Sequence, residues 1–558
     1  MRSASSGRAG SASHDSRGAR HPVTVMAEQM TDVFLDLGYR IVEGPEVEAE
    51  WFAFDALNMD DDHPGRTPDR AFHLEDPAEP GGRSGLVLRT RTSPAQVRAM
   101  LGRTPPLRLV CAGRAFRPDA ADTIHSPVFN QVEGLAVDLG LTMVDLKKTL
   151  DHFAAAVFGR GTVTRLRTHR SAYTDPSAKV YVECAVCHGV REDVSEDAPG
   201  DAAGDASAGP CGTCGGGGWI EWGWCGTVRP LVLTTCGVDP HRYGAFAFGV
   251  GVERTLMLRH GLKDISDIVG GDIRFPLGMD EFAPGGRPRP TPRPRTTATT
   301  RAVPAARAVP DLEIIPLTRG GHGRRGPQGR EAGGGLTRSQ SLRRRIGHAL
   351  AGAGYVETPR FPFVCDAAWD AFGLAPDDPR RATLTLTNPI SPREPSLRTT
   401  LLPGLLAALG LNLALGNHYP ALFEQGVVFA PRTGADLTLW PLADHRPTAS
   451  RLDALNATVP AQPSHLAIAL TGESSWARAV DTARTAAHVM GAGLITRPTE
   501  YAPWRPGRCL ELLVGEAVLG HAGELHTATV QALGLPPGTS VMEIDLTALE
   551  HLTDQGGT

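Results

Sequence analysis

Hydrophobic residues recur at helix and strand spacing along most of the chain. Between Pro22 and Gly38 the apolar positions fall three or four apart, which predicts an amphipathic helix that ends at the glycine. The same spacing predicts a second helix over 142–158. The segment YRIVEGPEVE predicts a short strand, and LVLRTRTS, LRLVCAGRAF and FNQVEGLAVD are further β-type runs. This mixture favours an α+β fold with antiparallel strands.

A similar pattern returns in the C-terminal part. SLRRRIGHALAGAGYVET predicts a helix followed by a strand, LRTTLLPGLLAALGLNLAL a helix, and ALFEQGVVFA a strand. The pattern is compatible with a second copy of a related domain. The identity between the two parts is too faint to establish a repeat from the sequence.

A segment rich in proline, arginine and glycine separates the two parts. Residues 284–330 carry ten arginines against Asp311 and Glu313. The prolines and glycines predict an extended, flexible linker, and a basic patch for nucleic acid is the alternative. Since 558 residues exceed what one core usually organises, several domains are expected. The predicted organisation is a disordered segment over 1–20, an N-terminal domain over 21–283, the linker over 284–335 and a C-terminal domain over 336–558.

Composition narrows the class of protein. Hydrophobic residues at 41% and charged residues at 21% are typical of a globular chain and exclude a disordered or fibrous one. No apolar run approaches the roughly 20 residues of a membrane span, and residues 1–20 do not resemble a signal peptide. Nine cysteines are too few for a disulfide-stapled secreted fold. We therefore expect a soluble, cytoplasmic protein without a membrane partner.

Two arginines stand in apolar or glycine-rich segments. Arg117 lies in GRAFRPDAADTIHSPVFNQVEG and Arg254 in AFAFGVGVERTLMLRHG. A buried arginine needs an anionic partner, because an unpaired buried charge is very costly. Two such arginines suit a polyphosphate, which offers several oxygens for forked contacts. Two structural ion pairs are the alternative.

Four cysteines form two closely spaced pairs. Cys184 and Cys187 lie before an acidic, glycine-rich insertion, and Cys211 and Cys214 lie after it. Two Cys-x2-Cys pairs in an intracellular protein are typical of a structural zinc (Zn2+) site. An unmetallated thiol cluster is the alternative.

The two arginine segments resemble motifs 2 and 3 of class II aminoacyl-tRNA synthetases, in particular the α subunit of phenylalanyl-tRNA synthetase. GPEVE, FDALNMDDDHPGR and LRTRTSPAQ resemble the same subunit in the same order, so that the resemblance covers about 21–275. The C-terminal segments TNPISPREPSLRTTLLPGLL, RPGRCLELLVGEAVLGHAGELH and VMEIDL resemble the core of the β subunit. The resemblance implies a class II antiparallel-sheet catalytic domain linked to a second, related and catalytically inactive domain.

The resemblance also implies sites for ATP and an amino acid. Arg117 would hold the α-phosphate and Arg254 the γ-phosphate, with His125 beside them. Asp119 would lie near the adenine amino group, and Phe129 would stack on the base. The implied amino-acid site consists of Gln131 and Glu133, which would hold the α-amino group, together with Ser93, Gln96, Ser171, Tyr173 and Ala247. Magnesium (Mg2+) would neutralise the phosphates, with Asp175 and Glu221 as candidate ligands.

The sequence also departs from the family. RSAYTDP stands where the family has YFPFTEP, so that Ser171 and Tyr173 occupy the ring-contact positions. Arg91 stands where the family usually has His or Gln, and Arg229 replaces a histidine. The family's tRNA-gripping arm and editing region have no counterpart, which predicts weak tRNA binding.

The leading interpretation is a ligase that activates an amino acid as its adenylate, with transfer to tRNA as the family reaction. One alternative is a paralogue that activates an amino acid other than phenylalanine and transfers it to a small molecule, a peptide or a carrier protein. Another is a non-catalytic sensor of an amino acid or a nucleotide. Motif 1 of the family implies a homodimer formed through the α-like part.

Overall fold

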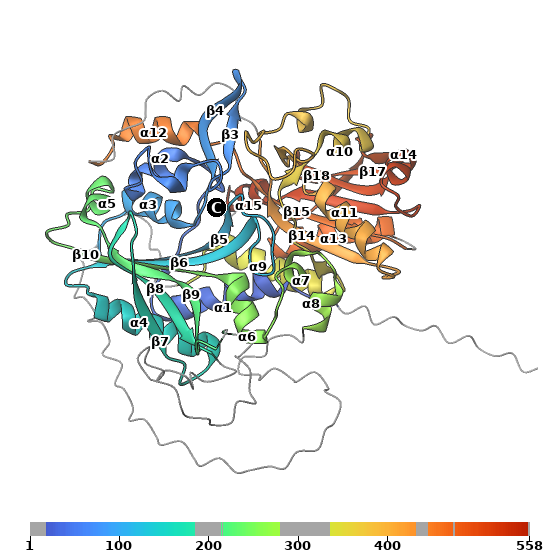
Figure 1. The fold of residues 1–558 in the computed structure, drawn as a ribbon. Helices are drawn as coiled ribbons and strands as arrows, with labels where there is room; N and C mark the ends of the chain where they lie inside the picture. The colour runs from blue at the N-terminus through green and yellow to red at the C-terminus, as the bar shows by residue number, and fades with distance from the viewer. Residues whose placement is uncertain are drawn as a thin grey trace, which may run out of the picture. The chain divides into compact units, whose positions relative to one another are not determined.

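The computed structural model describes residues 18–184, 214, 216–279, 335–430, 445–472 and 475–555, which Figure 1 draws in colour. All of these residues belong to one compact unit. Most of the predicted N-terminal segment 1–20 and of the predicted linker 284–335 lies outside the described residues.

A seven-stranded sheet organises the first part of the chain. Its first strand runs parallel to its neighbour, and all the other neighbouring pairs are antiparallel. The strands in spatial order are β1 (Arg40–Ile41), β5 (Leu107–Phe116), β6 (Val128–Asp138), β10 (Gly244–Gly251), β9 (Trp219–Val228), β8 (Thr174–Glu183) and β7 (Thr164–His169). The predicted α+β fold with antiparallel strands is confirmed.

The segment YRIVEGPEVE, predicted as one strand, is divided between two sheets. Its beginning forms β1 of the large sheet, and its end belongs to a three-stranded sheet. That sheet contains β2 (Val47–Ala49), β4 (Glu79–Leu88) and β3 (His73–Asp76). Pro45 has no N–H to offer to a ladder, and the carbonyl of Gly44 accepts a hydrogen bond from Arg89 Nη1 at 2.9 Å. The strand therefore breaks at these two residues.

Both helices predicted in the first part are present. α1 starts with Pro22, the His21 side chain accepts a hydrogen bond from the Val23 N–H in its first turn, and Gly38 lies just after its end at a φ of 80°. α4 begins with a capping box between Thr142 and Asp145. The helices of this part are α1 (Pro22–Asp36), α2 (Glu50–Ala53), α3 (Ser93–Leu101), α4 (Met143–Phe158), α5 (Pro230–Thr235), α6 (Val252–His260), α7 (Ser266–Val269) and α8 (Arg274–Gly278).

The C-terminal part is built around a second seven-stranded sheet. Its strands in spatial order are β11 (Val356–Glu357), β14 (Ala421–Val427), β15 (Ser464–Leu470), β19 (Ser540–Asp545), β18 (Ala517–Leu525), β17 (Trp504–Val514) and β16 (Ile495–Pro498). A separate pair is formed by β12 (Phe363–Val364) and β13 (Ser396–Leu397). The helices are α9 (Arg338–Gly352), α10 (Asp366–Ala371), α11 (Leu402–Ala414), α12 (Ala449–Thr458), α13 (Ser475–Val489), α14 (Thr527–Ala532) and α15 (Leu546–Gln555).

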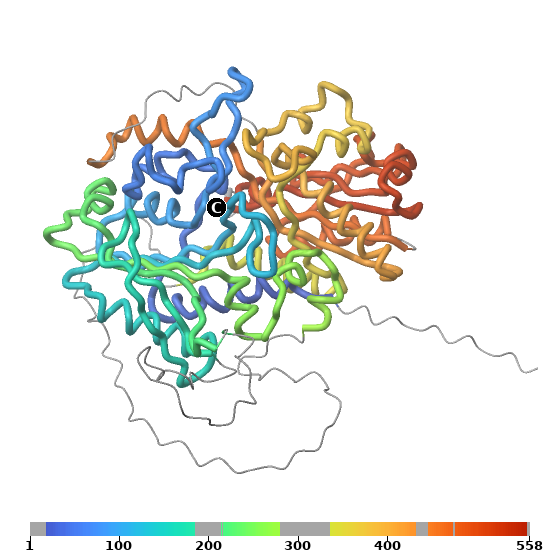
Figure 2. Tube along the Cα trace, viewed as in Figure 1, coloured from blue at the N-terminus to red at the C-terminus, as the bar shows by residue number. Residues whose placement is uncertain are grey.

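The two large sheets have the same topology, which the chain trace in Figure 2 lets the reader follow from blue to green and from yellow to red. In each, a helix precedes a short first strand that pairs in parallel with the next long strand, and a helix follows the third and the last strand in chain order. The C-terminal part is therefore a structural duplicate of the N-terminal part.

A buried arginine marks the same place in both copies. Arg89 and Arg398 each follow a leucine and precede a threonine in the sequence. Each guanidinium lies against a glycine of the following long strand, where a Cβ atom would come within 2.3 Å of Arg89 Nη2 at Gly113 and within 2.5 Å of Arg398 Nη2 at Gly426. These glycines are needed because only a residue without a side chain leaves room for the guanidinium.

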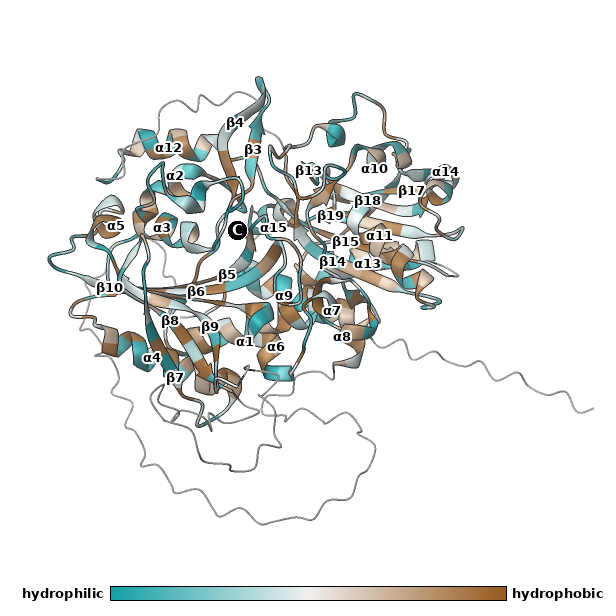
Figure 3. Ribbon diagram, viewed as in Figure 1, coloured by the Kyte–Doolittle hydropathy of each residue, from teal (hydrophilic) through white to brown (hydrophobic). Residues whose placement is uncertain are grey.

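The apolar positions of the strands and helices form the cores of the two copies (Figure 3). In the first copy, Phe34 of α1 packs against Phe153 and Phe248, with ring centroids 4.6 and 5.0 Å apart. In the second copy, the most apolar helix is α11, which is buried against β14 and β15. Within the described ranges, no helix has the length and apolar character needed to cross a membrane.

The two copies are joined by polar contacts. Arg344 of α9 pairs with Asp32 of α1 at 2.7 Å. The Gln462 side chain accepts hydrogen bonds from the backbone N–H groups of Glu46 and Val47 at 2.7 and 3.0 Å. The first helix of one copy therefore contacts the first helix of the other.

Candidate active site

A cavity of about 800 Å³ opens beside β8 and β9 in the N-terminal copy. Its wall includes Arg91, Arg117, Tyr173, Trp224 and Arg229. β8 and β9 present their residues to it because alternate side chains of neighbouring strands share one face of a sheet. The cavity is thus lined by arginines and aromatic rings.

Arg117 follows the last residue of β5, and its backbone N–H donates to Pro127 O at 3.0 Å. Its Nε donates to Thr90 O at 3.3 Å, and its guanidinium lies 5.1 Å from the centre of the Phe129 ring. Burial, followed by the nearby Arg91, lowers the pKa of Arg117. Since no carboxylate forms an ion pair with it in the described part of the chain, this arginine can receive an anion.

Arg91 and Tyr173 also line the cavity. The Arg91 guanidinium stands 5.1 Å from the centre of the Tyr173 ring, which meets Trp224 edge to face at 5.1 Å. Ser171 Oγ accepts a hydrogen bond from Tyr173 N at 3.4 Å, and its carbonyl accepts one from Arg229. Ser171 and Tyr173 both line the cavity, and their predicted contact with the substrate side chain stays a prediction.

Glu133 is fully buried on β6, next to the cavity. Its carboxylate accepts hydrogen bonds from Ser93 Oγ at 2.5 Å and Thr92 N at 3.3 Å. Burial raises the pKa of Glu133, and the hydrogen bond from Ser93 and the charge of Arg91 oppose that shift. A carboxylate in this setting is suited to hold a cation such as an ammonium group.

Several buried polar atoms around the cavity have no hydrogen-bond partner among the described residues. They include Gln96 Nε2, Gln131 Oε1, Arg91 Nε and Arg229 Nε. Buried polar groups are almost always satisfied, by protein, water or ligand. These atoms are therefore available to a bound molecule or to ordered water.

Three further predicted nucleotide residues, His125, Asp119 and Phe129, lie in or next to the loop between β5 and β6. His125 is exposed, and its Nδ1 lies 2.8 Å from Asp122 Oδ2. Asp119 is half-buried in the same loop and interacts electrostatically with Arg117. Phe129, on β6, is the ring that faces Arg117. The structure thus brings Arg117, Asp119 and Phe129 together, whereas His125 turns to Asp122.

Arg254 and Ala247 lie farther from the cavity wall. Arg254 is in the first turn of α6, and its Nε lies 3.4 Å from the carbonyl of Glu221. Ala247 is buried on β10, opposite Leu135 and Gly226. Neither of these two side chains lines the cavity, although both elements belong to the sheet that forms it.

Glu253, next to Arg254, is a buried acid that the sequence did not single out. Its carboxylate accepts hydrogen bonds from Asn130 N and Asn130 Nδ2, the latter at 2.7 Å. Burial raises its pKa to about 7, from a reference value of 4.5. The raised pKa means that this group stabilises the fold fully below about pH 4.5, and that this stability is lost as the pH rises through about 7.

Glu253→Gln is therefore expected to make the unfolding free energy less dependent on pH. Between pH 5 and pH 8, the unfolding free energy of the variant should rise by up to about 3 kcal/mol relative to that of the wild type, because the variant carries no buried charge at this position. Urea unfolding at the two pH values measures this difference. The exposed Glu516→Gln is the control, and an unchanged pH dependence in Glu253→Gln would contradict the prediction.

The two candidate magnesium ligands are far apart. Asp175 lies near the start of β8, whereas Glu221 of β9 is opposite Tyr181, six positions along β8. At about 3.3 Å per residue this is roughly 20 Å, too far for one ion to bind both side chains. Each acid also has a cationic neighbour, Arg229 at 3.5 Å from Asp175 and Lys179 at 2.9 Å from Glu221. The two candidate ligands therefore do not converge, and a role of either carboxylate in magnesium binding stays a prediction.

Two of the four predicted zinc ligands, Cys184 and Cys214, lie among the described residues. Cys187 and Cys211 lie outside the described residues. Cys184 is buried at the end of β8, and its backbone N–H donates to Gly218 O at 2.9 Å. Cys214 Sγ accepts a hydrogen bond from Gly218 N at 3.2 Å. The segments that enter and leave the insertion thus meet at Gly218. Among the described residues, no group of three or more metal-ligating side chains occurs.

Sequence reasoning missed part of the cavity wall. Trp224, Lys179, His63 and Met59 line it but were not predicted as site residues. Arg91 and Arg229 were noticed only as departures from the family. Of these residues, Trp224 has a sequence pattern that could have identified it, because it alternates with Trp222 in a strand-like run. The sequence does not show which of the two tryptophans faces the cavity.

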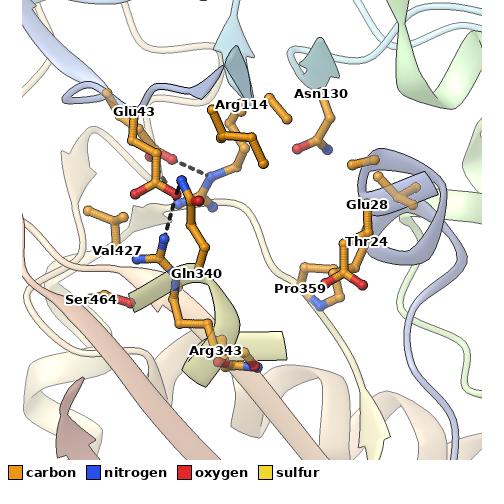
Figure 4. A pocket seen from close by; sticks show the side chains of 18 of the residues that line it. Thr24, Glu28, Glu43, Arg114, Asn130, Gln340, Arg343, Pro359, Val427 and Ser464 are labelled. Carbon is orange, nitrogen blue, oxygen red and sulfur yellow. Dashed lines mark hydrogen bonds and ion pairs between the residues drawn. The ribbon is translucent and has the colours of Figure 1, made fainter. Parts of the chain in front are cut away.

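A second cavity, of about 740 Å³, lies where the two copies meet (Figure 4). Its charged side chains largely pair with one another, including Arg343 with Glu43, and Arg114 with Glu46 at 2.8 Å. None of the site residues predicted from the sequence lines it. The predicted site residues that line a cavity therefore line the first one.

Comparison with known proteins identifies the family to which the chain belongs. Residues 9–278 match the tRNA synthetases class II core domain (F), and residues 324–546 match the phenylalanyl tRNA synthetase beta chain CLM domain. Over 266 residues the chain is 52% identical to the phenylalanine–tRNA ligase alpha subunit of Streptomyces avermitilis, covering 47% of this chain and 71% of that protein. The corresponding subunit of Streptomyces coelicolor is 50% identical, with 47% and 70% covered, and that of Thermobifida fusca 51% identical, with 46% and 66% covered. The chain belongs to the family of phenylalanine–tRNA ligase alpha subunits, with a module of the beta-chain type joined to it.

Proposed function

We propose that the protein is an ATP-dependent ligase of the phenylalanyl-tRNA synthetase type, which activates phenylalanine as its adenylate and transfers it to tRNA. The proposal rests on the presence of two groups of opposite charge at the cavity. Arg117 lines it without a carboxylate partner in the described chain, and the buried carboxylate of Glu133 lies next to it. An amino acid and a triphosphate need these two groups at one site.

In the first step, a carboxylate oxygen of the amino acid attacks the α-phosphorus of ATP. The bond to the bridging oxygen breaks, and pyrophosphate leaves with the electron pair. Arg117 stabilises the charge on the α-phosphate, and Arg254 binds the γ-phosphate. Phe129 and Asp119 hold the adenine, and His125 lies along the phosphates once it leaves Asp122. In the second step, a terminal ribose hydroxyl of tRNA attacks the activated carbonyl, and AMP leaves.

The amino acid is held by its own charges. Glu133 and Gln131 receive the ammonium group, since one is a buried carboxylate and the other has a buried oxygen without a partner among the described residues. Ser93 fixes the Glu133 carboxylate, and Gln96 adds a polar contact. Ser171, Tyr173 and Ala247 are proposed to surround the side chain. Substrate binding should weaken in acid, because protonation removes the charge of Glu133.

The second copy is proposed to be inactive, because it lacks the charged groups of the first. The strand registers place Ala430 where the first copy has Arg117 and Ala467 where it has Glu133. The backbone contact is the same, since Ala430 N donates to Ala461 O as Arg117 N donates to Pro127 O. We propose the domain boundaries 21–283 for the catalytic domain, 284–335 for the linker and 336–558 for the inactive domain.

Class II synthetases use ATP and Mg2+, which neutralises phosphate charge. Because Asp175 and Glu221 do not converge, no step is assigned to a protein-bound magnesium ion. We retain a structural zinc ion as a proposal for the insertion, supported by the two Cys-x2-Cys pairs and by the approach of Cys184 and Cys214 to Gly218. We also place the reaction in the cytoplasm, where ATP, amino acids and tRNA are supplied.

Protein purified without added zinc is expected to contain one zinc ion per chain. The tetrahedral site would need both Cys-x2-Cys pairs, so Cys187→Ser combined with Cys214→Ser should abolish the metal content and lower the melting temperature. Elemental analysis measures the metal. Cys365→Ser, outside the insertion, is the control. A wild-type protein without zinc, or a double variant that retains it, would contradict the proposal.

The expected homodimer has no support in the structure. The α-like part, through which such a dimer was expected to form, contacts the second copy of the same chain, for instance where α1 meets α9. We therefore propose that the two copies within one chain take the place of the two subunits of such a dimer. Light scattering is expected to give a mass near 59.2 kDa at micromolar concentration. A mass twice as large that persists on dilution would restore the homodimer.

Amino-acid-dependent ATP–pyrophosphate exchange tests the proposed function without presuming an acceptor. Phenylalanine is expected to support exchange, and a panel of other amino acids tests the polar pocket formed by Ser171, Arg91 and Arg229. The paralogue and sensor alternatives are not favoured, because the relatives are named as ligases of phenylalanine and tRNA. Binding without any exchange would indicate the sensor, and exchange only with another amino acid would indicate the paralogue.

A further inference from the structure

Glu253 joins the first turn of α6 to strand β6. Its two carboxylate oxygens accept hydrogen bonds from the backbone N–H of Asn130, at 3.0 and 2.9 Å. One of these oxygens also accepts a hydrogen bond from Asn130 Nδ2, at 2.7 Å. Glu253 itself is buried. A single buried carboxylate therefore binds both the backbone and the side chain of one strand residue.

This contact lies between residues that are proposed to bind the substrates. Arg254 follows Glu253 in the first turn of α6. Asn130 lies between Phe129 and Gln131 on β6. Because side chains alternate along a strand, Asn130 points to one face of the sheet, and its two neighbours point to the other. Glu253 thus supports this part of β6 from the face opposite to the proposed substrate-binding side chains.

The second copy makes the same contact without an acid. The strand registers make Thr547 the counterpart of Glu253 and Ser464 the counterpart of Asn130. Glu253 and Thr547 are each the second residue of the helix that follows the last strand. Ser464 N donates to Thr547 Oγ1 at 2.9 Å. Asn130 and Ser464 also both line the cavity between the copies (Figure 4). The backbone contact between strand and helix is therefore present in both copies.

The comparison separates what the fold needs from what the acid adds. A neutral hydroxyl is enough for the backbone contact in the second copy, whereas a buried carboxylate is costly, and burial raises the pKa of Glu253 to about 7. Thr547 is followed by Ala548, whereas Glu253 is followed by Arg254. The acid thus occurs in the copy that carries the arginine, and the hydroxyl in the copy that lacks it. The acid therefore serves a purpose beyond the fold.

We propose that Glu253 is a positioning residue, which fixes Arg254 relative to β6 so that the guanidinium meets the γ-phosphate of ATP. This inference rests on the proposed role of Arg254 in adenylate formation. The hydrogen bonds from Asn130 set where the first turn of α6 lies along β6, and the Arg254 side chain starts in that turn. A displacement of about 1 Å at such a group can slow a reaction about 10²-fold.

Glu253→Thr, which gives this position the residue type of the second copy, tests the proposal on the full chain. It is expected to lower kcat/KM for ATP in phenylalanine-dependent pyrophosphate exchange by about 10–100-fold. The KM for phenylalanine should stay within twofold of wild type, because β6 remains bonded to both of its neighbouring strands. The dissociation constant for ATP with Mg2+, measured by calorimetry without an amino acid, should rise by roughly tenfold.

The matched control is Thr547→Ala in the second copy. It removes the equivalent hydrogen bond from Ser464 and should leave exchange and the ATP dissociation constant within twofold of wild type. An effect of Thr547→Ala as large as that of Glu253→Thr would contradict the proposal, because it would show that the contact acts through the stability of the whole chain.

A second variant weakens the contact from the strand side and leaves the acid in place. Asn130→Ser removes the Nδ2 donor but keeps the backbone N–H, and it is expected to lower kcat/KM for ATP by roughly two- to tenfold. Circular dichroism at the assay temperature checks that each variant is folded. Wild-type exchange in a folded Glu253→Thr or Asn130→Ser variant would overturn the proposal.

A double variant shows whether Glu253 acts through the arginine. Glu253→Thr combined with Arg254→Ala is expected to reduce exchange no more than Arg254→Ala alone, because the group that Glu253 positions is then absent. Losses that multiply would show that Glu253 acts independently of Arg254, and the proposal would be wrong.

ATP binding separates this inference from the proposed function. A wild type that shows no exchange with any amino acid would refute the proposed function. ATP binding that is weakened by Glu253→Thr and not by Thr547→Ala would still support the positioning role in that case. ATP binding that is unchanged by Glu253→Thr would contradict it.

Discussion

Replacing Arg117 with alanine is expected to slow phenylalanine-dependent ATP–pyrophosphate exchange by about 10²–10³-fold, the usual loss when one preorganised charge-stabilising group is removed. The guanidinium is partly buried beside Phe129, without an ion pair to a carboxylate in the described chain. Its effect should fall on kcat more than on KM, because the charge on the α-phosphate spreads in the transition state.

The matched control is Arg108→Ala, on the same strand β5. Arg108 is half-exposed and pairs with Asp138 at 3.5 Å, outside the cavity. It should leave exchange within twofold of wild type. Arg254→Ala is expected to reduce exchange as Arg117→Ala does, since the γ-phosphate must be held while pyrophosphate leaves. Near-normal exchange in both the Arg117 and Arg254 variants would overturn the assignment of the nucleotide site.

Replacing Arg398 with methionine is expected to destabilise the protein by about 3–5 kcal/mol, the loss typical of a buried ion pair from which one partner is removed. Arg398 and Glu424 are each only 1% exposed and lie 2.8 Å apart. Glu424 would remain buried without its cation. Equilibrium unfolding in urea, followed by tryptophan fluorescence and circular dichroism, measures the change.

The double variant Arg398→Met with Glu424→Met distinguishes the effect of the charge pair from that of packing. Because two apolar side chains leave no unpaired charge, it should recover much of the stability. A double variant as unstable as the single one would show that the arginine acts through its shape against Gly426. The comparison is the ion pair of Arg497 and Glu511, in which the arginine is exposed, since Arg497→Ala should cost less than about 1 kcal/mol.

Local pattern in the sequence determined the helices and most of the strands. α1 and α4 were predictable because their apolar spacing, capping residues and terminal glycine act within one or two turns. The motif segments carrying Arg117, Glu133 and Arg254 were likewise found, because the same short segments that resemble the family also form β5, β6 and α6. The apolar alternation did not reveal that Gly44 and Pro45 divide one apparent strand between two sheets.

The tertiary structure decided the features that depend on register and on contacts distant in sequence. The duplication is evident in the strand order and in the equivalent settings of Arg89 and Arg398, although the sequence identity between the copies is too faint to establish it. The wide separation of Asp175 and Glu221 likewise follows from strand register.

The pairing of β7 with β8 shows the same division. The sequence displays the alternating arginines, but only the pairing of β7 with β8 sets Arg167 opposite Lys179, and only the second sheet supplies Arg497 and Glu511 for comparison. Helix signals are local, because a helix bonds to itself within four residues. A sheet bonds to segments far away along the chain, so its register and the sites built on it depend on the whole fold.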